Sequence, residues 1–270
     1  MLFRSVDAHE AFVVQSTQEM SARGDWIVPW FNGEPRLNKP PLNYWLTGIV
    51  AWLDGTPAQI KPWHARAVSA CAALVMTVLT FCAARLLYRR PVAMLATAFL
   101  ITSLGFFNYS HDARPDMLYA ALCAAGYVAF MGAWKASRPG VRNWSPYLMW
   151  GAYALATLSK GPQLPAMYLL ASLLFCRLGG MTWGETGQRL RPATGLLLYA
   201  LVTLPWWYLI QQELGGERLH NTQLSGSLLT TVRFDQFYQF YYFYRPLLLV
   251  FPWIMFLPHA VLDRKSTRLN

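Results

Sequence analysis

The stretch of the chain best suited to chemistry is a lysine placed directly before two prolines. Lys39 is followed by Pro40 and Pro41, and an aromatic and apolar run begins at Leu42. Proline fixes its own φ, biases the residue before it towards an extended backbone, and is well tolerated in the first turn of a helix. We therefore expect Lys39 on a stiff extended segment before a helix over residues 42–53. A helix N-terminus attracts anions, so a lipid phosphate would fit here, and a simple membrane-proximal loop would fit the same residues.

Other ionisable residues stand at the ends of apolar segments. They are Asp7, Glu10, His111, Asp112, Arg114, Asp116 and Lys160. A carboxylate can act as a general base, and a lysine can stabilise the charge on a departing phosphate. Each group also has a structural interpretation, because Asp7 and Asp116 are placed to cap helices and Lys160 could be a turn cation at a membrane surface.

The composition is that of an integral membrane protein. Of the 270 residues, 55% are apolar and only 13% are charged, whereas a soluble domain has about 25% charged residues. The 12 Trp and 14 Tyr residues fit aromatic belts at membrane surfaces. The net charge of +10 comes mostly from short loops, so we attribute it to membrane topology and expect no nucleic acid partner. The four cysteines lie inside apolar segments without paired spacing and are interpreted as packing residues.

The pattern of apolar segments predicts an all-α, polytopic protein of about seven spans. A polar helix over 7–22 and the short apolar helix over 42–53 are expected at the membrane surface. The expected spans are 65–86, 91–108, 116–134, 145–159, 162–177, 193–211 and 246–262. This divides the chain into an outer-face segment at 1–63, a transmembrane bundle at 64–262 and a cytoplasmic tail at 263–270.

The basic residues alternate between loops and predict the topology. Three of them follow every second span, in segments 85–90, 135–144 and 177–192 and in the C-terminal tail. The positive-inside rule places those segments in the cytoplasm. The loops on the outer face are then 109–115, 159–161 and 212–245. The residues suited to chemistry all fall on that face, so we expect Asp7 and Lys160 to meet at one cavity.

Several motifs resemble the polyprenyl-phosphate-dependent glycosyltransferases of the GT-C fold, which include bacterial lipid A aminoarabinose transferases and protein O-mannosyltransferases. The matching residues, in order, are Asp7 through Glu19-Met20, Gly24-Asp25-Trp26 with Pro29, Lys39-Pro40-Pro41-Leu42 with Tyr44-Trp45, Arg114-Pro115-Asp116, Ser159-Lys160-Gly161-Pro162, Leu204-Pro205-Trp206 and Phe240-Tyr241-Tyr242-Phe243-Tyr244. The family often has Asp-Glu where this chain reads Asp7-Ala8. Its members are longer and have a span before the Asp motif, so we expect this chain to be a fragment.

The resemblance implies a GT-C helical bundle with juxtamembrane helices, in the bacterial inner membrane, with its active site facing the periplasm. It also implies inverting transfer of a sugar from a polyprenyl phosphate to a hydroxyl of lipid A, a protein or a glycan. Asp7 is then the candidate general base and Asp116 a second catalytic carboxylate. Lys39 and Lys160 are the candidate ligands of the lipid phosphate.

The remaining candidates are weaker. Possible contacts to the acceptor or the sugar are Glu10, His111, Asp112, Arg114, Tyr241 and Tyr242. Trp206, Trp207 and the aromatic run at 240–244 are interpreted mainly as belt anchors. No cofactor is assigned from the sequence. Some relatives use a divalent metal, but the sequence has no ligand cluster of recognisable spacing, so no metal site is assigned.

The alternative function is a transporter or flippase for a lipid-linked phosphate, without chemistry. A transporter usually has ionisable residues near the membrane midplane and internal repeats. Here the charged residues lie at the ends of the expected spans, and we find no repeat. This favours an enzyme.

Overall fold

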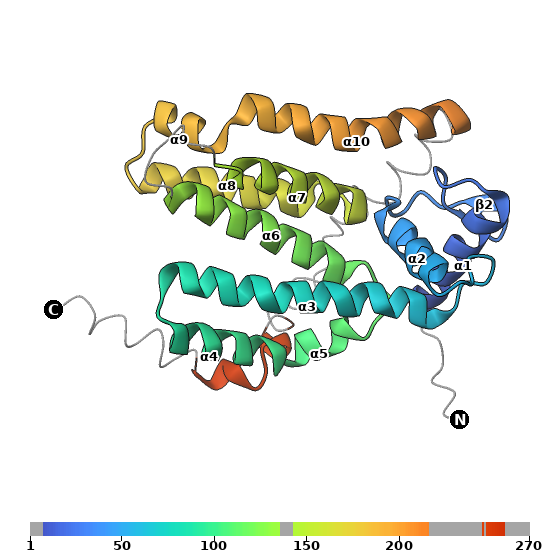
Figure 1. Ribbon diagram of the computed structural model, residues 1–270, viewed down its shortest axis with the longest axis horizontal. Coiled ribbons are helices and arrows are strands. Elements are labelled where there is room, and N and C mark those ends of the chain that lie inside the picture. The colour runs from blue at the N-terminus through green and yellow to red at the C-terminus, as the bar shows by residue number, and fades with distance from the viewer. Residues whose placement is uncertain (1–7, 136–142, 216–244, 246, 257–270) are drawn as a thin grey trace, which may run out of the picture.

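The computed structural model describes residues 8–135, 143–215, 245 and 247–256. This part of the chain is helical apart from one short hairpin (Figure 1). In chain order the elements are α1 (Ala8–Arg23), β1 (Trp30–Phe31), β2 (Glu34–Pro35), α2 (Leu42–Leu53), α3 (Pro62–Leu87), α4 (Arg90–Ile101), α5 (Leu104–Ser110), α6 (Asp116–Lys135), α7 (Ser145–Lys160), α8 (Gln163–Leu178), α9 (Trp183–Leu190), α10 (Pro192–Leu214) and the 3₁₀ helix η3 (Trp253–Phe256).

The long helices form a bundle, and the N-terminal elements cover one end of it (Figure 1). Helix α6 packs between α3 and α7, and α10 packs against α7. Close packing depends on small residues: a Cβ on Gly126 of α6 would lie 2.3 Å from the Tyr153 ring of α7. We call α1, β1, β2 and α2, with the segments between them, the N-terminal layer. It contacts the bundle through α3 and α7.

The helices support fewer spans than the sequence predicts. Three helical segments are long and apolar enough to cross a membrane: α3, α6 and Trp183–Leu214, which contains α9 and α10. Helices α4 and α5 together pass the same test, but they meet at a bend of 62°. The described chain therefore has three candidate spans, or four if the bent pair counts as one span. Seven spans stay a prediction.

Two of the expected spans need correction. The segment 91–108 is broken at Thr102, because the Ser103 side chain accepts a hydrogen bond from the Phe106 N–H and starts α5 as a separate helix. The described part of 246–262 has helical residues at 247–249, then a turn at 250–252 and η3, so it is not one continuous helix. By contrast, α7 and α8 meet at the predicted turn, where Gly161 has φ +125°.

The hairpin of the N-terminal layer was not predicted, although its sequence contains the signal. Asn32 and Gly33 have φ of 54° and 78°, as a two-residue turn between antiparallel strands requires. The Glu19 carboxylate of α1 accepts hydrogen bonds from the N–H groups of both residues, at 2.7 and 3.1 Å. Burial opposes ionisation of Glu19, but these hydrogen bonds outweigh it and lower its pKa. The hairpin is thereby fixed to α1.

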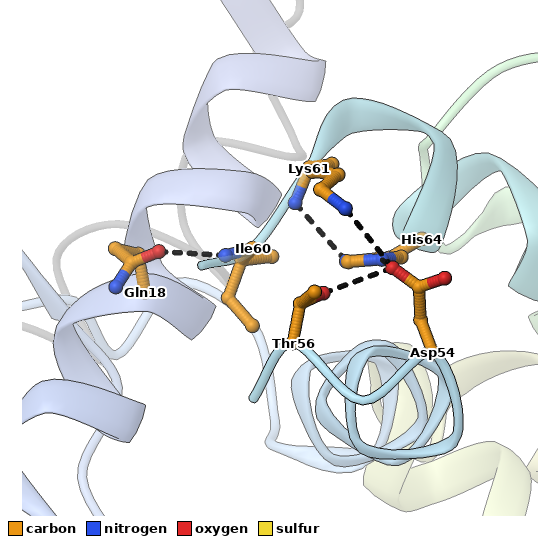
Figure 2. Close-up of polar contacts among 6 residues, drawn as sticks. All are labelled: Gln18, Asp54, Thr56, Ile60, Lys61 and His64. Carbon is orange, nitrogen blue, oxygen red and sulfur yellow. Dashed lines mark hydrogen bonds and ion pairs between the residues drawn. The ribbon is translucent and has the colours of Figure 1, made fainter. Parts of the chain in front are cut away.

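A polar cluster joins the far end of α2 to α1 and α3 (Figure 2). We call it the Asp54–His64 cluster. Asp54 Oδ2 lies 2.9 Å from Thr56 Oγ1, 3.0 Å from Lys61 Nζ and 3.2 Å from His64 Nε2. The Lys61 N–H donates to His64 Nδ1 at 3.0 Å, and the Ile60 N–H donates to the Gln18 side chain at 2.7 Å. His64 is fully buried, so this network fixes the turn between α2 and α3.

Candidate active site

A cavity of about 170 Å³ lies where the N-terminal layer meets the ends of the bundle helices. It is bounded by α1, the segment before α2, the first turn of α2, the start of α6 and the end of α7. Its lining residues are Phe12, Val13, Arg36, Lys39, Asn43, Tyr44, Arg114, Pro115, Asp116 and Lys160. Four of the residues chosen from the sequence therefore meet at one cavity, although more than 100 residues separate Lys39 from Lys160.

Lys39 occupies the extended segment before α2, as predicted. The helix begins at Leu42, and the Trp45 N–H donates to the Pro41 carbonyl at 3.0 Å. Burial lowers the pKa of Lys39, the charges of Lys160 and Arg36 lower it further, and Asp116 partly compensates. Burial and neighbouring cations disfavour the protonated form of Lys39, and an anion bound nearby would favour it.

Lys160 and Asp116 form an ion pair across the cavity wall. Asp116 is the first residue of α6, and Lys160 is the last residue of α7. Their positions are fixed by Tyr119, whose hydroxyl donates to the Gly161 carbonyl at 2.9 Å and accepts from the Leu164 N–H at 3.0 Å. A single tyrosine of α6 thus holds the turn that carries Lys160.

Arg114 also lines the cavity, and its Nε lies 2.8 Å from the Asp112 carboxylate. Ser69 of α3 donates to the Arg114 carbonyl at 3.3 Å, which ties the segment before α6 to α3. Asp112 is not among the lining residues. Its described connection to the cavity is the ion pair that positions Arg114.

Two further predicted contact residues, like Asp112, lie outside the cavity lining. Glu10 is 3% exposed and pairs with Arg66 of α3, with 2.8 Å between Glu10 Oε2 and Arg66 Nη2. The His111 ring is exposed and lies 2.9 Å from both the Ser110 hydroxyl and the Phe107 carbonyl. Glu10 therefore joins α1 to α3, and His111 bonds within its own turn. Asp7, Tyr241 and Tyr242 lie outside the described residues.

The sequence analysis missed three polar residues of the cavity. They are Arg36, Asn43 and Tyr44. Arg36 stands three residues before Lys39, and Asn43 and Tyr44 fall in the first turn of α2. A helical projection of α2 would have placed Asn43 beside the Lys39 segment, but nothing local in the sequence indicates where Arg36 points.

The aromatic motifs hold the site together. The Trp45 indole N–H donates to the Trp26 carbonyl at 2.7 Å, and the Trp206 indole N–H donates to the Ile27 carbonyl at 2.9 Å. The Trp26 ring also covers Gly48, where a Cβ would come within 2.4 Å of it. Trp206 is only 4% exposed, so its interpretation as a membrane-belt anchor is wrong. It fixes the N-terminal layer to α10.

No group of three or more His, Cys, Asp or Glu side chains in the described ranges could hold a metal ion. The chemistry available to the described cavity residues is that of cations, one carboxylate, an amide and a hydroxyl. Such a set suits the binding of a phosphate and the stabilisation of charge on it.

The fold is that of a known class of membrane protein. Two solved structures of ArnT from Cupriavidus metallidurans, one apo and one bound to undecaprenyl phosphate, match this chain with a TM-score of 0.80 each. The matches are 21% and 20% identical and cover 97% of this chain and 47% of the ArnT chain. At this level of identity the likeness establishes the fold.

Sequence comparison supplies the family. The family model described as dolichyl-phosphate-mannose-protein mannosyltransferase matches residues 38–209, more than half of the chain, so the protein belongs to this family. This confirms the resemblance seen in the motifs.

The curated relatives include undecaprenyl phosphate-alpha-4-amino-4-deoxy-L-arabinose arabinosyl transferases. The Yersinia pestis protein is 30% identical over 153 residues, which is 56% of this chain and 26% of that protein. The Sodalis glossinidius protein is 28% identical over 200 residues, which is 73% of this chain and 34% of that protein. The chain thus spans about a quarter to a third of these relatives.

Proposed function

We propose that the protein is a membrane glycosyltransferase that moves a sugar from a polyprenyl-phosphate donor to an acceptor hydroxyl, with inversion, on the periplasmic face of a bacterial inner membrane. The observation that carries the proposal is the cavity in which Lys39 and Lys160 face the same space as Asp116. Its family and the names of the curated relatives support the same chemistry. Lipid A, a protein or a glycan could supply the hydroxyl.

In this reaction the acceptor oxygen forms a bond to the anomeric carbon of the sugar. The bond between that carbon and the phosphate oxygen breaks, and its electron pair stays on the phosphate. The acceptor proton passes to a general base, for which Asp7 is the candidate by its match to the family motif. The donor is a phosphodiester with one negative charge, and the product is a phosphomonoester that carries a second.

The described residues have separate roles in this proposal. Lys39 and Lys160 bind the phosphate and stabilise the charge that it gains. Asp116 holds Lys160 and orients the acceptor, and Arg114, held by Asp112, adds a donor at the wall of the cavity. Glu10 is a positioning residue, because its ion pair with Arg66 fixes the start of α1 directly after Asp7.

The test is sugar transfer from a radiolabelled polyprenyl-phosphate sugar by membranes that carry the full-length protein. We expect Asp7→Asn to lose transfer and to retain binding of the polyprenyl phosphate. Unchanged transfer would remove Asp7 from the mechanism. Movement of the labelled lipid across the membrane without sugar transfer would support the flippase alternative.

A further inference from the structure

The four cations that line the cavity differ in whether a carboxylate pairs with them. Lys160 pairs with Asp116, and Arg114 lies 2.8 Å from Asp112. Neither Arg36 nor Lys39 has a carboxylate partner among the residues that the structure describes. A wall that holds two cations without an ion-pair partner is suited to a ligand with two negative charges.

Arg36 is held in place by groups that leave its hydrogen-bonding edge available. Its guanidinium lies 3.9 Å from the centre of the Phe12 ring and 5.5 Å from that of Phe31. The hydroxyl of Tyr44, which is 2% exposed, hydrogen-bonds to the guanidinium. The Arg36 Nε is buried and has no hydrogen-bond partner in the described chain. A guanidinium stacked on a ring can still donate in its own plane, and a phosphate accepts such bonds in pairs.

Asn43 supplies a second unused donor at the same cavity. The side chain is 3% exposed, and its Nδ2 has no hydrogen-bond partner among the described residues. A buried amide without a partner is costly, so a native protein usually retains one where a ligand will bond to it. Asn43 lines the cavity next to Lys39 and lies in the first turn of α2.

We propose that Arg36 and Asn43 complete the phosphate site, and that Arg36 acts on the negative charge that appears when the sugar leaves. This inference rests on the proposed function. When the bond from the anomeric carbon to the phosphate oxygen breaks, that oxygen keeps the electron pair and the phosphate changes from a diester to a monoester. The second charge of a phosphomonoester is present near neutral pH, because its second pKa is about 6. Lys39 and Lys160 bind the phosphate, and Arg36 adds to the stabilisation of its second charge.

The site should therefore prefer a polyprenyl phosphate to the methyl ester of the same lipid, which keeps only one charge. In Arg36→Gln we expect binding of the monoester to weaken about 10- to 100-fold, the size of a lost charge-assisted bond, and binding of the methyl ester to change about threefold or less. In sugar transfer, kcat should fall and the KM for the donor should stay near that of the wild type.

Arg23→Gln is the matched control. Arg23 also stacks on a ring of the hairpin, 4.1 Å from the centre of Trp30, but it is not among the residues that line the cavity. We expect this variant to keep the wild-type preference for the monoester. Arg36→Lys retains the charge without the paired donors, and it should keep part of the preference. It also covers the case in which Arg36→Gln does not fold.

Asn43→Leu separates ligand binding from packing. If the amide only fills space, an apolar side chain of similar size should leave lipid binding unchanged. If the amide donates to the phosphate, binding of both the monoester and the methyl ester should weaken about tenfold, because both present phosphate oxygens. The melting temperature should not fall, since a buried donor without a protein partner has been removed.

The outcomes are distinguishable. Arg36→Gln with an unchanged preference for the monoester, in a protein that binds both lipids, would overturn the role of Arg36. Asn43→Leu with unchanged binding of both lipids would overturn the role of Asn43. A wild-type protein that transfers no sugar and binds neither lipid would overturn the proposed function itself.

Discussion

Helix α2 has a polar cluster at each of its ends, and the two clusters differ in how their charges are balanced. At the C-terminal end, Asp54 accepts from Thr56, Lys61 and His64, so the Asp54–His64 cluster is complete without a ligand (Figure 2). At the N-terminal end, the cavity brings Lys39 and other cations against few carboxylates.

The difference indicates which cluster is structural and which awaits a ligand. In the Asp54–His64 cluster the hydrogen bond from Lys61, and then those from Thr56 and His64, lower the pKa of Asp54. In the cavity, burial and neighbouring cations lower the pKa of Lys39. The lowered pKa of Asp54 shows that the protein stabilises its negative charge. The lowered pKa of Lys39 shows that the protein does not fully stabilise its positive charge, which is the state expected of a site that binds an anion.

Removing the charge of Lys39 should have the largest effect on function. In Lys39→Met we expect sugar transfer to fall about 10²- to 10³-fold, the usual size for a lost preorganised charge at a reacting centre. Stability should not fall, because a desolvated cation is replaced by an apolar side chain of similar length. Transfer assays and thermal unfolding in detergent measure the two effects. A large loss of stability would place Lys39 with the structural residues.

His64→Ala tests the Asp54–His64 cluster, which we assign as structural. The variant removes a buried ring that accepts from the Lys61 N–H and bonds to Asp54, so the first turn of α3 loses a cap. We expect the free energy of unfolding to fall by about 2–3 kcal/mol. Transfer per folded molecule should stay near that of the wild type.

Lys61→Ala provides the control for this variant. It removes only the ion pair with Asp54, in which both side chains are partly exposed. The expected loss is much smaller than that of His64→Ala, because an exposed ion pair contributes little to stability. A catalytic defect in folded His64→Ala would contradict the structural assignment.

The lowered pKa of Lys39 predicts that the affinity for the donor lipid falls at alkaline pH. Neutral lysine cannot pair with a phosphate, so affinity for polyprenyl phosphate should fall as pH rises through a value below the ordinary lysine pKa of about 10.4. In Lys39→Arg this fall in affinity should occur at higher pH, because a guanidinium stays protonated. Binding titrations across pH measure the effect.

The lowered pKa of Lys39 affects stability in the opposite direction: donor affinity falls as pH rises, whereas the free energy of unfolding increases. Between the lowered pKa and the ordinary one, the unfolded chain binds more protons at Lys39 than the folded protein does. The contribution of Lys39 to the free energy of unfolding therefore rises with pH over that window. A fall in donor affinity that only followed loss of the folded protein would contradict this account.

Trp206→Phe should have the smallest effect. It keeps an aromatic ring in the core and loses the hydrogen bond to the Ile27 carbonyl. We expect a loss of about 1 kcal/mol in the free energy of unfolding, with transfer reduced less than in Lys39→Met. Trp207→Phe is the matched control, since no hydrogen bond of the Trp207 indole N–H contributes to this contact.

Local sequence signals were sufficient for the elements that carry the cavity. The two prolines after Lys39 and the apolar run beyond them predicted α2 with its observed bounds. Pro115 and Asp116 predicted the start of α6, and the residues around Gly161 predicted the turn after α7. These signals act over a few residues, because proline restricts φ and glycine permits a positive φ.

Only the tertiary structure decided which polar groups meet. Glu10 and Arg66 are 56 positions apart, and Trp206 bonds to a carbonyl 179 positions away. The free edge of Arg36 depends on Phe12, which lies on α1. Long-range packing fixes such contacts, and no local pattern encodes them. The sequence by itself therefore determined where cations and helix ends occur, and the packing of α1 and α2 on the bundle determined which cations remain without a carboxylate.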